Sequence, residues 1–395
     1  MNVFVTDGNS RAALAITRSL GRKGHHVIVG CKRSTSLSSC SRYCADSVSY
    51  PDPACDSEAF IQHLKILVEE YSIDLLVPVT DVCVLPVSKH REQFSSRLRI
   101  PLPPDESLRI AADKNRLIEI ATTLGVSVPK SFIVDNPENI IRSLYKLDYP
   151  LVIKPSRSRV PDKNGWISTS VDYAETPGEL EEKLCKMPTP VFPIILQERI
   201  VGPGIGLFYC YHEGKKIASF AHQRLREKPP SGGVSVLRES VDIDPVADGY
   251  SQILLENLNW HGVAMVEFKR DLRDGQPKLM EINGRFWGSL QLAVDSGVDF
   301  PAILAMPTSD QPDTKNTNNT YEVGIRSRWL WGDIDLLLMY LFKSSRQLNL
   351  PPGAPSRWKS LRKILNPFGH NLHYEVLRFS DLKPWLHETM QWFRN

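Results

Sequence analysis

Residues 262–290, GVAMVEFKRDLRDGQPKLMEINGRFWGSL, contain the pattern that decides the fold of this chain. Two segments rich in strand-forming residues, 263–269 and 278–283, flank a polar segment with an Asp-Gly turn signal. This arrangement predicts an antiparallel β-hairpin. Side chains alternate between the two faces of a strand. The apolar face is therefore expected to hold Ala264, Val266, Phe268, Met280 and Ile282, and the polar face Glu267, Glu281 and Asn283.

The polar face of this hairpin brings two carboxylates together. If Lys269 lies opposite Leu279, then Glu267 lies opposite Glu281, with about 4.5–5.5 Å between their Cβ atoms. Facing carboxylates repel each other unless a positive charge lies between them. Together with the amide oxygen of Asn283 they are ligands of the kind that Mg²⁺ prefers. The pattern therefore predicts a magnesium site that carries the phosphates of a nucleotide.

A hairpin whose polar face is only solvated is the alternative interpretation. The residues after the second strand disfavour it, because a solvated turn has little use for Phe286 and Trp287 beside an arginine. Arg285 also adds a forked donor for an anionic oxygen. We therefore interpret the hairpin and the turn after it as a binding site.

The segment MEINGRFWGS, preceded by an acidic strand residue, resembles the metal-binding signature of the ATP-grasp ligases. The resemblance covers roughly residues 1–306. It implies an α/β chain in which an ATP-grasp fold is preceded by a small parallel-sheet α/β domain and followed by a C-terminal extension. The expected units are a leading domain (1–104), a helix with the lid subdomain (105–196), the body with the metal-binding hairpin (197–306), a polar linker (307–320) and a basic, Trp-rich extension (321–395).

Length and composition allow a large soluble protein of several domains. The chain has 395 residues and a 42% hydrophobic content, and its net charge of +3 gives no support to a nucleic-acid partner. No apolar run approaches the ~20 residues of a membrane span. Seven cysteines without regular spacing fit a reducing compartment, so a cytoplasmic location is expected. Cys40 and Cys44 resemble half of a metal site, but no further pair completes it, and an ordinary loop is favoured.

The leading segment alternates strands with helices, which predicts a parallel sheet. Its first turn, DGNSRAA, keeps only one glycine of the dinucleotide fingerprint, which disfavours a nicotinamide site. Ser10 and Arg11 would lie at a helix N-terminus, and Asp81 follows another strand in the same crevice. In ATP-grasp enzymes this domain usually helps to bind the acceptor, so these three residues are expected to contact substrate.

The resemblance implies that two lysines hold the nucleotide's phosphates. Lys114 lies in a helical stretch (105–124), where a solvated lysine is the ordinary alternative, and Lys154 ends the apolar strand LVIK. The following loop (155–168) departs from the family because Gly165 is its only glycine. Its basic residues either bind phosphate or belong to a solvated, mobile lid. These residues are Arg157, Arg159 and Lys163.

The remaining site residues are also implied by the resemblance. Residues 197–200 would form the hinge that reads the adenine, namely Gln197, Glu198, Arg199 and Ile200, while the ribose contact stays unassigned. Arg224 resembles an acceptor contact of the carbamoyl-phosphate-synthase-like, carboxylate–amine ligase branch, although a surface arginine is the alternative. Gly232 and Gly233 belong to an exposed loop beside it.

The function implied is ATP-dependent activation of a small carboxylate to an acylphosphate, followed by attack of an amine. ATP and Mg²⁺ (or Mn²⁺) would be required, with Arg285 and Arg224 as catalytic residues. A carboxylate or carbamate kinase and a catalytically weak regulatory protein are the alternatives. The extension holds five of the eight tryptophans and 11 Lys/Arg against 6 Asp/Glu. We expect it to dock on the body; contact with a partner or a membrane, and a homodimer, are left open.

Overall fold

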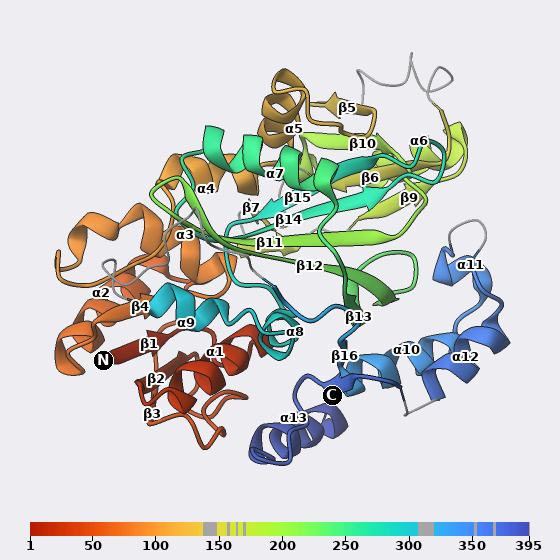
Figure 1. Cartoon of the computed structure of the whole chain (residues 1–395). Coiled ribbons are helices and arrows are strands. Elements are labelled where there is room, and N and C mark those ends of the chain that lie inside the picture. Colours follow the sequence, from red (N-terminus) through yellow and green to blue (C-terminus); the bar gives the residue numbers. More distant parts are fainter. Residues whose placement is uncertain are drawn as a thin grey trace.

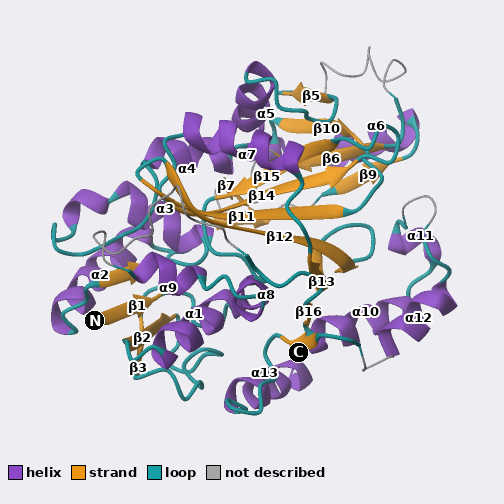
Figure 2. Cartoon of the chain, in the orientation of Figure 1, coloured by secondary structure: helices purple, strands orange, loops and turns teal. Residues whose placement is uncertain are grey.

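The computed structural model describes residues 1–136, 148–155, 159–162, 165–168, 171–306, 320–350, 354–365 and 369–394. Three larger sheets organise this part of the chain, and Figures 1 and 2 show helices on both sides of the largest one. The predicted α/β architecture, with a parallel-sheet domain ahead of the body, is confirmed.

The leading domain is a four-stranded parallel sheet in the order β3-β2-β1-β4. Its strands are β1 (Asn2–Val5), β2 (His26–Cys31), β3 (Asp46–Ser49) and β4 (Leu75–Val77). Its helices are α1 (Arg11–Arg22), α2 (Ser57–Glu70) and α3 (Asp81–Lys89). Helix α3 begins at Asp81, whose negative charge is favourable in the first turn of a helix.

The lid is a second, antiparallel sheet in the order β5-β10-β6-β9. Its strands are β5 (Ser131–Val134), β6 (Leu151–Pro155), β9 (Asp172–Ala174) and β10 (Ile194–Glu198), with α6 (Pro177–Lys186) packed on them. β7 (Arg159–Asp162) and β8 (Gly165–Ser168) form a separate hairpin. Arg157 and Lys163 lie outside the described residues, and only the backbone of Arg159 is described.

The helical stretch expected over 105–124 is two helices, α4 (Asp105–Ala112) and α5 (Lys114–Thr123). The break occurs at Asp113, whose carboxylate accepts hydrogen bonds from the backbone N–H groups of Asn115 and Arg116. An N-cap of this kind satisfies donors that a helix start leaves free. Lys114 is therefore the first residue of a new helix rather than a residue inside a longer one.

The body is a seven-stranded sheet in the order β15-β14-β11-β12-β13-β16-β17. Its first five strands are β11 (Gly204–His212), β12 (Lys215–Lys228), β13 (Val234–Ser240), β14 (Gly262–Arg270) and β15 (Pro277–Asn283). One face packs on α4, α5 and α7 (Pro245–Asn257). The other face packs on α1, α8 (Leu290–Asp295) and α9 (Phe300–Ala305). Both apolar cores include leading-domain residues, so the leading domain and the body share their cores.

The C-terminal extension continues the body sheet. Its strands β16 (Arg326–Arg328) and β17 (Leu372–Tyr374) add to the edge at β13. Its helices are α10 (Leu330–Phe342), α11 (Ser345–Leu348), α12 (Arg357–Leu365) and α13 (Lys383–Arg394). Leu336 and Tyr340 of α10 pack with Val236 of β13, which confirms the predicted docking. In the described part of the chain, no helix is both long and apolar enough to cross a membrane. The predicted linker (307–320) lies outside the described residues except for Thr320.

Candidate active site

A cavity of about 570 Å³ lies where the lid, the body and the leading domain meet, and we call it the main cavity. Of the sixteen residues that the sequence singles out, Ser10 and Asp81 do not line it. Ser10 lines a smaller cavity beside it, and Asp81 pairs with Arg285. The predicted residues that line the main cavity are Arg11, Lys114, Lys154, Gln197, Glu198, Arg199, Ile200, Arg224, Gly232, Gly233, Glu267, Glu281, Asn283 and Arg285.

The hairpin β14–β15 has the predicted central pair, because Glu267 lies opposite Glu281. The predicted register next to this pair is wrong: Phe268, not Lys269, lies opposite Leu279. The cause is a bulge in which Met280 is the extra residue, and a bulge turns side chains to the other face. Met280 was expected on the apolar face and instead lines the cavity beside Glu281.

The two carboxylates of the hairpin are buried in an environment of high local charge. Burial raises the pKa of Glu267 to about 7, while Arg224 opposes this shift and Glu281 adds to it. The pKa of Glu281 is held below its ordinary value, because Lys114 and the hydrogen bond from the Asn283 amide outweigh its burial. Such perturbed, facing carboxylates are typical of functional sites.

The donor set of the hairpin fits a hard divalent cation. Glu267, Glu281 and Asn283 offer two carboxylates and one amide oxygen, which suits Mg²⁺ whose remaining positions are taken by phosphate and water. Within the described residues, no group of three or more His, Cys, Asp or Glu side chains could hold a metal ion by itself. All seven cysteines are free, and Cys40 and Cys44 belong to no such group.

Lys154 reaches the cavity from the lid. Its ammonium donates a hydrogen bond of 2.6 Å to Gln197 Oε1. Burial lowers the pKa of Lys154 to about 8; Glu281 counteracts this shift and Lys114 adds to it. A partly desolvated lysine close to a second lysine favours an anion between them, since either positive charge alone is poorly compensated.

Residues 197–199 of the predicted hinge make contacts with several strands of the lid. The amide of Gln197 connects Lys154 to Ser131, and Glu198 accepts a hydrogen bond from the backbone N–H of Lys130. Arg199 lies over the ring of Tyr173, with 4.6 Å between its guanidinium carbon and the ring centroid. These contacts are all with the lid, whereas Arg273 Nη2 of the body donates a hydrogen bond of 2.8 Å to Glu198 Oε2. Residues 197–199 are therefore tied to both the lid and the body.

Arg224 is not a solvated surface arginine. It forms an ion pair with Glu267, and a second one of 3.0 Å with Glu227. It also donates a hydrogen bond of 3.2 Å to the carbonyl of Gly233. The loop between β12 and β13, which contains Gly232, is thus held to the β14–β15 hairpin through this one side chain.

Arg285 connects the hairpin to the leading domain. Its Nε atom lies 2.9 Å from Asp81 Oδ1, and its Nη2 donates a hydrogen bond of 3.1 Å to Asn283 Oδ1. The Asp81 side chain is more than half exposed. The structure thus brings Asp81, the first residue of α3 in the leading domain, to the hairpin.

Sequence reasoning missed His222, which lines the main cavity and is fully buried. Gly206 lies between His222 and Glu267 in the sheet, and a Cβ atom on Gly206 would come within 2.9 Å of His222 Nε2. Within the described residues neither ring nitrogen has a hydrogen-bond partner. Burial, with the charges of Arg224 and Arg238, lowers the pKa of His222 well below its ordinary value. The imidazole is therefore neutral at pH 7.

Two further residues were missed because they become neighbours only in the fold. Arg238 of β13 lines the cavity and is 1% exposed. It forms an ion pair with Glu375, which follows β17 in the extension. Of these residues only His222 could have been found from the local sequence. It lies two positions before Arg224, so its side chain is expected on the same face of the strand as that of Arg224.

The comparisons with known proteins agree with this architecture. Residues 193–330 match the family described as "ATP-grasp in the biosynthetic pathway with Ter operon". The chain matches no curated protein sequence. Among solved structures, an L-amino acid ligase from Bacillus licheniformis superposes with a TM-score of 0.63 at 17% identity, over 82% of this chain and 78% of that chain.

Two further solved structures have a similar fold. An N5-carboxyaminoimidazole synthetase from Staphylococcus aureus, complexed with ADP, has a TM-score of 0.61 and 15% identity, over 82% of this chain and 80% of that chain. The biotin carboxylase domain of a 2-oxoglutarate carboxylase from Hydrogenobacter thermophilus, in complex with MgADP, ADP and bicarbonate, has a TM-score of 0.62 and 13% identity. It covers 82% of this chain and 73% of that chain. At these identities the likeness establishes a shared fold.

Proposed function

Since this chain is a member of the ATP-grasp superfamily by its fold, we propose that it is an ATP-dependent carboxylate–amine ligase that releases ADP and phosphate. One observation carries the proposal. The same cavity combines two lysines, Lys114 and Lys154, and a hard-oxygen donor set with a group of arginines beyond them. A site that transfers a phosphoryl group to a carboxylate needs both halves.

The nucleotide half of the site consists of the lid lysine, the hinge and the hairpin. Lys154 and Lys114 would bind the phosphates, and the hinge would take the adenine. Mg²⁺ held by Glu267, Glu281 and Asn283 would offset the charge of the transferring phosphoryl group. The similar folds that bind ADP and MgADP support an adenine nucleotide here.

The acyl half of the site consists of arginines that can stabilise developing negative charge. In the first step a carboxylate oxygen of the acid attacks the γ-phosphorus, and the bond to ADP breaks. In the second step the amine nitrogen attacks the acyl carbon, phosphate leaves, and the nitrogen gives a proton to solvent. Arg285 and Arg224 flank the hairpin where both steps would occur.

The experiment measures ADP release with an acid alone and with pairs of acids and amines. Because the acylphosphate would be shielded from water in the cavity, the acid alone should give slow ADP release. The matching amine should accelerate it strongly, with one amide formed per ADP. Arg285→Ala should depress both rates, whereas the exposed control Glu322→Gln should leave them unchanged.

Two other results would each support a different function. Full-speed ADP release without any amine, together with accumulation of a stable phosphorylated product, would mean a carboxylate kinase built on this site. Nucleotide binding without turnover by any acid would support a regulatory protein instead. Either result would remove the ligase proposal.

A further inference from the structure

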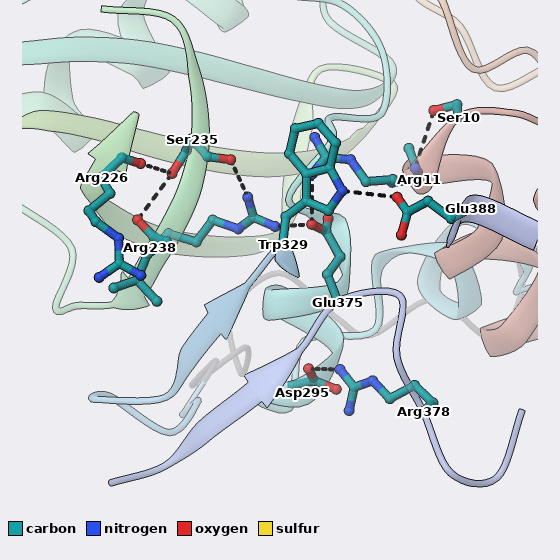
Figure 3. A network of polar contacts seen from close by, with 12 residues as sticks. Ser10, Arg11, Arg226, Ser235, Arg238, Asp295, Trp329, Glu375, Arg378 and Glu388 are labelled. Carbon is teal, nitrogen blue, oxygen red and sulfur yellow. Dashed lines mark hydrogen bonds and ion pairs between the residues drawn. The ribbon is translucent and has the colours of Figure 1, made fainter. Parts of the chain in front are cut away.

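A second cavity, of about 290 Å³, adjoins the main cavity and is bounded by the C-terminal extension. The two cavities share Arg11 and Gly288 in their walls. The leading domain and the extension supply the other walls. Those residues are Asn9, Ser10, Leu37, Trp329, Glu388 and Gln391. Figure 3 shows Arg11 against the Trp329 ring, with Glu375 and Glu388 of the extension near the same ring.

The junction of the two cavities carries an excess of positive charge. Arg11 Nη1 lies 3.0 Å from Glu375 Oε2, and Arg238 pairs with the same oxygen. Two guanidinium groups therefore share one carboxylate, which leaves one positive charge. Within the described residues, Arg238 Nε and Glu375 Oε1 are buried without a hydrogen-bond partner. Unpartnered buried polar atoms are costly: Arg238 Nε favours an anionic acceptor here, whereas Glu375 Oε1 would need a hydrogen-bond donor, such as an ammonium group.

The second cavity contains one carboxylate, that of Glu388, and shares the guanidinium of Arg11 with the main cavity. Glu388 is partly buried, and it accepts a hydrogen bond of 2.9 Å from Trp329 Nε1. Burial raises the pKa of this carboxyl to about 7, because its ionised form is poorly compensated. In the described part of the chain, no Lys, Arg or His lies within ion-pair distance of its carboxylate. Two cations already lie over the Trp329 ring: the guanidinium carbon of Arg11 is 3.7 Å and Lys228 Nζ is 4.8 Å from its centroid. The group in this cavity that a cation or a strong hydrogen-bond donor would complement is therefore the Glu388 carboxylate.

We propose, on the basis of the ligase function above, that the amine substrate is an α-amino acid whose side chain ends in a cation or a hydrogen-bond donor. Its carboxylate binds at Arg11 and Arg238, and its α-amine faces the main cavity. Its side chain enters the second cavity and ends at Glu388. The C-terminal extension thereby selects the amine.

Gly288 and Arg11 lie side by side where the two cavities meet. A Cβ atom on Gly288 would lie 3.2 Å from Arg11 Nη2, so even alanine there would crowd the guanidinium. Gly288 follows directly after Trp287 in the turn that begins at Arg285. A substrate whose backbone lies at Arg11 would therefore hold its amine next to the site of acyl transfer.

The test compares L-arginine and L-lysine with L-alanine as the amine, at a saturating concentration of the acid. The wild type should prefer the two basic amino acids. In Glu388→Gln, which keeps the hydrogen bond from Trp329, kcat/KM for L-arginine should fall at least tenfold while that for L-alanine stays the same. Glu388→Lys should shift the preference toward L-glutamate. Glu322→Gln, an exposed substitution in the extension, serves as the control.

A binding measurement separates this proposal from the ligase proposal. Calorimetry with L-arginine should show binding to the wild type that weakens at least tenfold in Glu388→Gln. If no acid and amine support ADP release, the ligase function fails, but a loss of L-arginine binding in the variant would still support the site. If amides form and the ratio of L-arginine to L-alanine use is the same in Glu388→Gln, the selection by the extension is wrong and the ligase function stands.

Discussion

The two ends of the main cavity are built in different ways. The end that would bind metal and phosphate comes largely from one hairpin and the turn after it, with Glu267, Glu281 and Arg285 close in sequence. The junction end comes from three segments, since Glu375 is 364 positions from Arg11 and 137 from Arg238. A substitution in the hairpin can change the chemistry of the site without disturbing the fold. The junction, in contrast, connects distant segments and contributes to the stability of the fold.

The charged groups at the two ends are also arranged differently. In the hairpin, the buried Glu267 and the half-buried Glu281 face each other, an arrangement that favours a ligand more than it favours stability. At the junction, two arginines share one carboxylate that is 2% exposed. We therefore expect substitutions in the hairpin to abolish turnover at little cost in stability, and substitutions at the junction to lower stability as well.

Glu281→Gln should give the largest effect. It keeps the shape of the side chain and removes one of the two carboxylates. ADP release should fall about 10³-fold or more, because metal stabilisation of phosphoryl transfer contributes several kcal/mol. The free energy of unfolding should change by less than about 1 kcal/mol. Steady-state assays and denaturant titrations measure the two quantities. Turnover like that of the wild type would remove the metal assignment.

Glu375→Ala should test the junction end. It would leave Arg11 and Arg238 buried without their shared carboxylate, and breaking a buried pair costs about 3–5 kcal/mol of unfolding free energy. Glu239→Ala is the matched control, since Glu239 pairs with the more exposed Arg326, and should cost about 1 kcal/mol or less. Denaturant titrations of both variants give the comparison. Equal losses in the two variants would mean that the junction is no more structural than the surface.

A smaller effect is expected for Lys154, whose protonation should make the affinity for ADP depend on pH. The pKa of about 8 means that its ammonium is present below pH 8 and is lost above it. ADP affinity should therefore weaken about tenfold between pH 7 and pH 9, which corresponds to roughly 1.4 kcal/mol. Lys154→Arg keeps its charge over this range and should show a much weaker dependence. Calorimetry on both proteins checks this. Parallel pH profiles would exclude Lys154 as a phosphate ligand.

The hairpin could be predicted from sequence because its signals are local. A turn between two strand-forming segments and the alternation of faces placed Glu267 opposite Glu281. The bulge at Met280 was not predictable, since one inserted residue leaves no trace in a pattern of alternating residues. The parallel sheet of the leading domain followed from alternating strands and helices, but β3, with the sequence DSVS, has no apolar alternation and was missed.

By itself, the sequence determined the two strands of the hairpin, the carboxylate pair and the lysine near the end of β6, because each depends on residues a few positions apart. Only the tertiary structure decided that Arg11, Arg238 and Glu375 meet, that Asp81 reaches Arg285, and that the extension closes a second cavity. The physical reason is that these contacts depend on how two sheets and a C-terminal segment pack. Such packing is set by burial over the whole chain, and burial is non-directional, so no local motif records it.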